Sequence, residues 1–316
     1  MNRPEKSRDL NLTIAMILRD SINTLPYSLQ GINNLEYDKS KVKMVFVDGG
    51  STDGSLEFLE KFKYQNTGVY RDIIIISGNY DVTEGRNECI RNADGEFILF
   101  VDSDVVVPRD LLLELVKIFS NDPKVAFVNV PCIVERNVEG WVDKVYRSMR
   151  EPQGMSCAAI RLSAINDVGP YFVGFSRGEN PNELIFRLRR KGYRYVVIDN
   201  EALHIKQKRR GFKDYLKTSL TASVIHHYQE IEAGRKYLIL KYIYYTTLLV
   251  SLLLIPFFPR IFTFIFGLLF ILLVVRYMVK SHGNIYSLLI IIVGILMPLG
   301  MLILLLRKLK DKIAGK

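Results

Sequence analysis

Cysteine is scarce in this sequence, and its scarcity excludes several classes of protein. The three cysteines, Cys89, Cys132 and Cys157, lie far apart, and none belongs to a C-x-x-C pair. A small, odd and scattered set predicts neither a disulfide framework nor a zinc site, and it is typical of a reducing compartment. We therefore expect no catalytic or metal-binding role for these residues.

Motifs of several binding classes are also missing. The sequence has no G-x-x-x-x-G-K-[ST] phosphate loop, no G-x-G-x-x-G signature, and no zinc knuckle, basic zipper or RNA-reading aromatic motif. The net charge is +10, but many basic residues lie between Lys206 and Lys241, directly before a set of apolar segments. This placement is typical of a cytosolic segment beside anionic lipid headgroups. We expect membrane lipids as a partner, and no nucleic acid.

Long apolar runs are absent before residue 241 and dominate the rest of the chain. They cover Tyr242–Phe258, Ile261–Val279 and Ile285–Leu306. A membrane span needs about 20 residues, so we predict a membrane domain over 242–316 with two or three transmembrane helices and a basic tail. Three crossings would place that tail outside, against the positive-inside tendency, whereas two crossings and a re-entrant first segment would return it to the cytosol.

The chain before the membrane domain divides into two parts. Residues 1–205 have the mixed composition of a soluble domain and begin without the apolar core of a signal peptide, so we expect this domain on the cytosolic face. Residues 206–241 are basic, and Phe212, Leu216 and Leu220 lie near helical spacing. This pattern predicts an amphipathic interfacial segment that leads to the membrane.

Strands and helices alternate through the soluble domain. Short apolar runs bounded by turn residues predict strands, and helical patterns follow most of them. The predicted strands are Leu12–Leu18, Val42–Val47, Ile73–Ile76, Phe97–Val101 and Val125–Val130. This alternation predicts an α/β domain with a mostly parallel sheet and helices on both faces.

The D-S-D sequence at Asp102–Asp104 directly follows the strand Phe97–Val101. Open α/β sheets bind ligands at the carboxyl ends of their strands, where these two carboxylates lie. Mg²⁺ and Mn²⁺ prefer oxygen ligands and commonly bridge to substrate phosphates. We therefore predict a metal–diphosphate site, although a polar turn before the helix from about Asp110 would use the same residue types.

A second polar turn, Asp48–Ser55, follows the second predicted strand. Its glycines, Gly49 among them, would let backbone N–H groups approach a ligand, and Asp48 would accept hydrogen bonds from a nucleoside. An ordinary strand–helix turn with Asp53 as the helix cap is equally compatible with these residues. Arg86 lies near the start of the helix predicted directly before the D-S-D strand, and it would bind a phosphate through its guanidinium or form a surface salt bridge.

The segments VFVDGGSTDGS, EGRNECIRNADGEFILFVDSDV and RGENPNELIFRLRRKGY follow one another in this order. Together they resemble inverting family-2 glycosyltransferases of GT-A fold over about Leu12–His204, and are similar to the membrane-anchored polyprenyl- or dolichyl-phosphate sugar synthases. The resemblance implies a nucleotide-sugar donor whose nucleoside contacts Asp48 and whose diphosphate binds Asp102 and Asp104 through Mn²⁺ or Mg²⁺. The segment Leu18-Arg19-Asp20 departs from the family's proline and asparagine, so no first-strand role is carried over.

A second departure concerns the catalytic base. Family members that act on a hydroxyl use a carboxylate of a Glu-Asp pair to take its proton. Asn180 and Pro181 occupy that place here, or Glu179 and Asn180 after a shift of one residue. A phosphate acceptor is already an anion and needs no base, so the departure favours polyprenyl phosphate. With a hydroxyl acceptor, Glu179 would be the base and Glu183 a poorer candidate.

The resemblance also implies roles for residues near the end of the soluble domain. In some similar enzymes a histidine at the place of His204 joins the metal site. Arg209 and Arg210 would bind the donor diphosphate, the acceptor phosphate or lipid headgroups. We expect Asp104 to be essential for catalysis.

These features together predict a membrane-bound, metal-dependent, inverting glycosyltransferase that moves a sugar from a nucleotide sugar to a lipid acceptor, with polyprenyl phosphate preferred. Extension of a lipid-linked oligosaccharide or glycolipid at a hydroxyl is one alternative, and a non-catalytic scaffold that binds nucleotide sugars is another. A processive polysaccharide synthase is disfavoured, because Gln207–Gly211 lacks the tryptophan of the Q-x-x-R-W segment.

Overall fold

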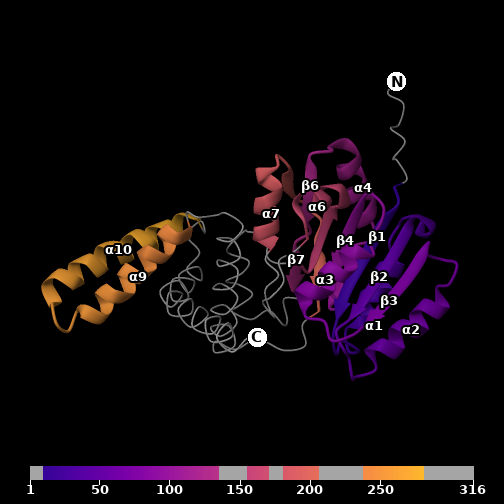
Figure 1. Cartoon of the computed structure of the whole chain (residues 1–316), viewed down its shortest axis with the longest axis horizontal. Coiled ribbons are helices and arrows are strands. Elements are labelled where there is room, and N and C mark those ends of the chain that lie inside the picture. The colour runs from indigo at the N-terminus through magenta and orange to yellow at the C-terminus, as the bar shows by residue number, and fades with distance from the viewer. Residues whose placement is uncertain (1–9, 135–154, 171–180, 206–237, 281–316) are drawn as a thin grey trace, which may run out of the picture. The chain divides into compact units, whose positions relative to one another are not determined.

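A computed structural model of the chain describes residues 10–134, 155–170, 181–205 and 238–280 (Figure 1). The described residues form two compact units, one up to residue 205 and one over 238–280. Most of the predicted interfacial segment 206–241 and the predicted apolar run from Ile285 lie outside the described residues.

The first unit is built on a seven-stranded sheet with the strand order β3-β2-β1-β4-β8-β6-β9. Figure 1 shows β3, β2, β1 and β4 side by side in this sheet. Strand β8 is antiparallel to β4 and β6, and the other neighbours pair in parallel. The strands are β1 Leu12–Leu18, β2 Val42–Asp48, β3 Asp72–Ser77, β4 Phe97–Val101, β6 Val125–Asn129, β8 Cys157–Arg161 and β9 Arg194–Val197. The predicted α/β class is confirmed, with a mixed sheet that is mostly parallel.

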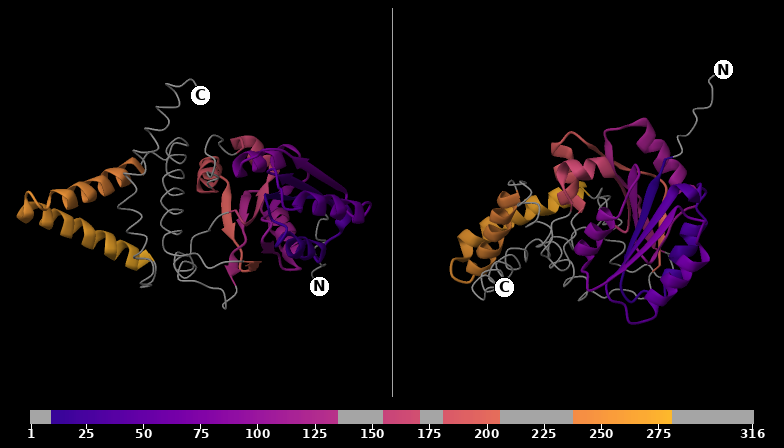
Figure 2. Two further views of the ribbon diagram at one scale, coloured as in Figure 1. Left: turned by 90° about the horizontal axis from the view of Figure 1, so that it is seen from below. Right: turned by 45° about the vertical axis from the view of Figure 1, so that its right-hand side comes forward.

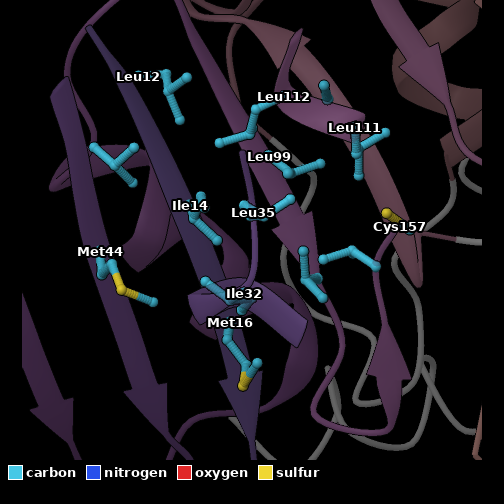
Figure 3. Packing of buried hydrophobic residues seen from close by; sticks show 14 of the residues in the cluster. Leu12, Ile14, Met16, Ile32, Leu35, Met44, Leu99, Leu111, Leu112 and Cys157 are labelled. Atoms are coloured by element: carbon cyan, nitrogen blue, oxygen red, sulfur yellow. The ribbon is translucent and has the colours of Figure 1, made fainter. Parts of the chain in front are cut away.

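Helices cover both faces of this sheet because successive strand residues point to opposite sides (Figure 2). Ile14 and Met16 of β1 pack with Met44 of β2 and Ile32 of α1, on the face covered by α1, α2 and α4 (Figure 3). Ala15 packs on the face covered by α3, α6 and α7. The helices are α1 Leu25–Asn33, α2 Ser55–Gln65, α3 Val82–Arg91, α4 Leu111–Asn121, α6 Leu162–Val168 and α7 Pro181–Arg190.

A small second sheet extends the first unit beside the D-S-D segment. It consists of β5 Val105–Val106, β10 Ala202–His204 and β7 Cys132–Val134, in the order β5-β10-β7. Strand β10 is antiparallel to β5 and parallel to β7, and its register places His204 opposite Val105. This pairing brings the end of the soluble domain next to the residues that follow β4.

The order of the strands reverses at β1. The chain runs outward from β1 through β2 and β3 and then returns to β4 on the other side of β1. In an open α/β sheet, such a reversal leaves a crevice outside the carboxyl ends of the strands, and ligands bind there. The loops after Leu18, Asp48, Ser77 and Val101 therefore surround the expected ligand site.

The second unit is a helical hairpin. It consists of helix α9 Leu238–Leu254 and helix α10 Pro259–Lys280 (Figure 2). The two helices contact one another through Tyr245, Leu248 and Leu273, which are buried. Most other large apolar side chains of the hairpin are exposed, and Phe257 and Phe264 are more than 70% exposed (73% and 72%). Within the described residues, one stretch, Pro259–Arg276, is both long and apolar enough to cross a membrane, and the apolar part of α9 is shorter.

Candidate active site

The D-S-D segment lies at the carboxyl end of β4, as the sequence predicts. Its backbone is fixed on both sides, because Asp102 N–H donates to Ser156 O (2.9 Å) and Val105 N–H donates to Asp102 O (3.1 Å). The side chains of Asp102 and Asp104 are 31% and 39% exposed. Both carboxylates are therefore held by a buried strand while remaining open to a ligand.

The side chains of Asp104 and His204 contact one another because β5 and β10 are neighbouring strands of the second sheet. The His204 Nε2 atom lies 2.9 Å from Asp104 Oδ2, although the two residues are 100 positions apart in the chain. The Ile205 N–H donates to Asp104 O at 2.7 Å, which fixes the same pairing through the backbone. The structure thus brings His204 to the D-S-D segment, and its role as a metal ligand stays a prediction.

The donor set suits a hard divalent cation only in part. In an octahedral ion with bonds of about 2.1 Å, adjacent ligand atoms lie about 3 Å apart. This is close to the distance between Asp104 Oδ2 and His204 Nε2. Asp102 points its Oδ1 atom at Arg86 instead, so it would have to contribute Oδ2. Among the described residues there is accordingly no cluster of three or more His, Cys, Asp or Glu arranged to hold an ion.

Arg86 holds Asp102 in place through a hydrogen-bonded ion pair. Its side chain is 2% exposed, and Nη2 donates to Asp102 Oδ1 at 3.1 Å while Nη1 donates to Met155 O at 3.2 Å. The guanidinium also lies 5.1 Å from the ring centroid of Phe100. Helix α3 approaches the sheet closely because it carries Gly85, where a Cβ atom would lie 2.9 Å from Ile17. The predicted contact of Arg86 with a phosphate stays a prediction, and the contact present in the structure is with a carboxylate.

Asp48 is fully buried at the end of β2, where it organises its own turn. Its carboxylate accepts hydrogen bonds from Gly50 N (3.2 Å), Ser51 N (3.2 Å), Ser77 Oγ (2.9 Å) and Ser51 Oγ. Gly49 leaves no room for a side chain, because a Cβ atom would lie 2.9 Å from Tyr80 O. The donor-binding roles of Asp48 and Gly49 stay predictions, because the contacts present in the structure are those within the turn itself.

The turn after β2 also holds the loop after β1, which sequence analysis did not anticipate. Three consecutive N–H groups of that loop donate to side chains of the turn. The pairs are Asp20 N to Ser51 Oγ (2.9 Å), Ser21 N to Ser55 Oγ (2.8 Å) and Ile22 N to Asp53 Oδ2 (2.9 Å). The polar residues of the S-T-D-G-S sequence therefore hold a neighbouring loop in place.

Asp53 also supports the start of α2, although the N-cap position is taken by Gly54, whose φ is +92°. Asp53 Oδ1 accepts hydrogen bonds from Ser55 N (3.1 Å) and Ser55 Oγ (2.6 Å). Burial alone would raise the pKa of this carboxyl, but the hydrogen bonds from Ser55 and Ile22 outweigh it and lower the pKa.

One further bond joins the loop after β1 to the D-S-D segment. Ser103 Oγ donates to Ser21 Oγ at 2.9 Å. Because Ser21 N–H is bound to Ser55, the segments after β1, β2 and β4 form one connected set of hydrogen bonds at the switch point. Ser21 and Ser103 are thus site residues that the sequence reasoning missed.

The acceptor side is described less fully. Glu179, Arg209 and Arg210 lie outside the described residues, so their predicted roles stay predictions. Glu183 is 2% exposed and forms an ion pair with Arg187, which also donates to Gly169 O at 2.9 Å. These contacts give Glu183 a place in the packing of α7 against α6, and they do not favour it as a base.

In all three cysteines the pKa of the thiol lies above its ordinary value. Cys89 and Cys157 are buried, and burial raises the pKa of both thiols. Burial, together with the charges of Asp102 and Asp104, raises the pKa of Cys132 to about 12. A thiol with such a pKa is protonated at neutral pH and is a poor nucleophile.

Two family descriptions match the chain. Glycosyl transferase family 2 matches residues 13–178, and glycosyl transferase family group 2 matches residues 97–305. The uncharacterized glycosyltransferase YfnE of Bacillus subtilis is 33% identical over 95 residues, which are 30% of this chain and 23% of that protein. A poly-beta-1,6-N-acetyl-D-glucosamine synthase of Staphylococcus aureus is 23% identical over 117 residues, which are 37% and 27% of the two chains. The chain thus matches about a quarter of the length of these curated relatives.

Solved structures show the same fold. The mannosyltransferase PcManGT from Pyrobaculum calidifontis, in complex with GDP-Man and Mn²⁺, superposes with a TM-score of 0.59 at 18% identity, over 73% of this chain and 66% of that one. GalNAc-T7 with UDP, GalNAc and Mn²⁺ gives a TM-score of 0.51 at 13% identity, over 64% and 45%. The fold is therefore GT-A-like. Since the family-2 match covers more than half of the sequence, the chain belongs to glycosyl transferase family 2.

Proposed function

We propose that this family-2 glycosyltransferase transfers a sugar from a nucleotide sugar, with inversion, to polyprenyl phosphate in a membrane. The observation that carries the donor half is the position of Asp102 and Asp104 at the switch point of the sheet, with His204 beside Asp104. Carboxylates at the switch point of an open α/β sheet suit a nucleoside diphosphate that is bound with a cation.

Asp104 and His204 would hold Mn²⁺ or Mg²⁺, and Asp102 would join them through Oδ2. A cation bound there would neutralise the charge that develops on the departing nucleoside diphosphate. Mn²⁺ is present in the two neighbouring structures with GDP-Man and with UDP, which supports this assignment by analogy of fold. Arg86 would keep Asp102 in its present rotamer while the donor binds.

The transfer itself is a displacement at the anomeric carbon. An acceptor oxygen forms a bond to that carbon from the face opposite the diphosphate, while the bond to the diphosphate oxygen breaks, so the configuration inverts. A phosphate acceptor carries its negative charge before it attacks and needs no general base. This supports polyprenyl phosphate because the expected aspartate is replaced at Asn180–Pro181 and Glu183 is engaged by Arg187.

The second unit supports a lipid acceptor. The 22 residues of α10 extend about 33 Å at 1.5 Å per residue, compared with about 30 Å for the hydrocarbon layer of a membrane. Both helices of the hairpin expose large apolar side chains on the surface that does not form their contact. We propose that the hairpin is embedded in the membrane and that the transferase unit acts on the cytosolic face.

The test uses membranes that contain the full chain. Labelled nucleotide sugars are supplied with Mn²⁺ or Mg²⁺, with and without added polyprenyl phosphate, and the label that enters the organic phase is counted. Labelling that depends on polyprenyl phosphate, and that Glu179→Gln leaves unchanged, is the expected result. Label that requires a preformed glycolipid and is lost in Glu179→Gln would indicate a hydroxyl acceptor. Nucleotide binding without any transfer would favour the non-catalytic scaffold.

A further inference from the structure

Asp20 has an unusual backbone conformation at the edge of the donor site. Among the described residues, it is the only one other than glycine with a positive φ, at +50°. This left-handed region is unfavourable for residues with a Cβ atom, although Asp and Asn tolerate it better than most. A residue held in such a conformation persists only where its surroundings fix it.

Asp20 is held by hydrogen bonds to the turn after β2, both through its side chain and through its backbone. Asp20 Oδ1 accepts hydrogen bonds from Thr52 N (2.8 Å) and from Thr52 Oγ1 (3.3 Å), and Asp20 N–H donates to Ser51 Oγ (2.9 Å). Ser51 Oγ in turn donates to the buried carboxylate of Asp48. We call this set of contacts among Asp20, Ser51 and Thr52 the loop latch.

The loop latch connects the two sides of the site. On one side it fixes the turn that contains Asp48 and Gly49. On the other side, the next residue, Ser21, is bonded to Ser103 of the D-S-D segment. A movement of Asp20 would therefore change the nucleoside side and the diphosphate side together.

We infer that Asp20 is a positioning residue that presets the donor site through the loop latch before the nucleotide binds. This rests on the proposed nucleotide-sugar donor. Binding to a preset site avoids the entropic cost of ordering two loops, so the latch increases donor affinity without any contact between Asp20 and the reacting atoms.

Three substitutions of Asp20 separate the effect of its acceptor oxygen from the effect of its backbone conformation. Asparagine retains an acceptor oxygen for Thr52 and tolerates a positive φ. Alanine loses the acceptor and disfavours the left-handed backbone, whereas glycine loses the acceptor and accepts the backbone. The expected order of donor affinity is therefore wild type and Asp20→Asn, then Asp20→Gly, then Asp20→Ala.

The matched control is Asp38→Ala. Asp38 is an exposed carboxylate that accepts hydrogen bonds from Ser40 N (3.0 Å) and Ser40 Oγ (2.7 Å). It caps the short helix before β2, at the opposite end of the strand from Asp48. Its loss removes comparable hydrogen bonds and leaves the donor site as it is.

The experiment measures binding of UDP and of GDP, each with Mn²⁺, to the purified full chain by calorimetry. Asp20→Ala is expected to bind about tenfold more weakly, from the loss of the bonds to Thr52 and the strained backbone, and to raise the donor KM while kcat changes by less than about twofold. Asp20→Asn and Asp38→Ala are expected to remain within about twofold of wild type. Equal affinity of Asp20→Ala and wild type, or equal weakness of Asp20→Asn and Asp20→Ala, would overturn the inference.

Hydrogen exchange without nucleotide separates this inference from the proposed function. Faster exchange of the amides of residues 50–55 in Asp20→Ala, but not in Asp20→Asn, supports the loop latch whether or not the donor has been identified correctly. If wild type binds neither nucleotide, the donor assignment is at fault. Unchanged exchange in Asp20→Ala overturns the latch.

Discussion

Replacement of Arg86 by methionine tests how the site is held together. Methionine has a similar length and no charge, so Arg86→Met removes the hydrogen bonds to Asp102 Oδ1 and to Met155 O with little change in packing volume. It also removes the contact of the guanidinium with the Phe100 ring. Asp102 then faces an apolar side chain.

The magnitude follows from the burial of the two partners. Removing one member of a buried ion pair costs about 3–5 kcal/mol in the free energy of unfolding. Arg86 is 2% exposed, but Asp102 is 31% exposed and recovers some hydration. We therefore expect the lower end, about 3 kcal/mol, which corresponds to about 6–12 °C in the melting temperature of a domain of this size.

The assay is thermal unfolding of the full chain in detergent, followed by far-ultraviolet circular dichroism. Arg86→Lys keeps the charge but cannot bind both partners at once, so it should melt between wild type and Arg86→Met. The cost of Arg86→Met should be smaller in an Asp102→Asn background, because the ion pair is already absent there. A melting temperature of Arg86→Met equal to that of wild type would refute the reasoning, as would the same cost in both backgrounds.

Three further predictions concern the cysteines, Asp94 and Glu183. Because burial raises the pKa of all three thiols, the folded chain should not react with iodoacetamide at neutral pH, whereas the unfolded chain should react at all three cysteines. Burial alone would raise the pKa of the Asp94 carboxyl, but hydrogen bonds from Arg71 and Lys43 outweigh it and lower the pKa. Its stabilising effect is therefore present above the unfolded pKa of about 3.9 and lost at lower pH, and Asp94→Asn should flatten the fall of stability in acid urea titrations. Glu183→Gln should lower stability by about 3 kcal/mol but retain the kcat of the folded enzyme, and a stable variant without transfer would contradict its structural assignment.

The sequence predicts the frame of the first unit well because its central strands, β1, β2, β4 and β6, are buried almost throughout. Phe97–Val101 is apolar at every position and is entirely buried in the structure, so a short apolar run alone identifies the strand. The carboxyl end of that strand then determines where Asp102 and Asp104 lie. The antiparallel insertion of β8 is not predictable in this way, because an apolar run carries no information about strand direction.

The side-chain partners within the site are less predictable. Asp104 and His204 are 100 positions apart in the chain and are brought together by the pairing of the short strands β5 and β10. Only the resemblance to a family indicated that His204 would lie near Asp104. For Arg86 the sequence predicts a phosphate contact or a surface salt bridge, but it gives no sign that the side chain is buried and paired with Asp102, which offsets the cost of burial. The contacts of Asp20 depend on the spatial proximity of two loops, which local sequence patterns do not encode.

The most direct test of the account is the dependence of sugar transfer on Asp104. Labelled UDP- and GDP-sugars would be offered to membranes that contain wild type, Asp104→Asn, or Asp72→Asn, a carboxylate at the opposite end of the sheet, with Mn²⁺ and polyprenyl phosphate. The account predicts a loss of at least about 100-fold in Asp104→Asn, with unchanged thermal unfolding, and wild-type transfer in Asp72→Asn. Transfer at the wild-type rate by Asp104→Asn would contradict the assignment of the catalytic site.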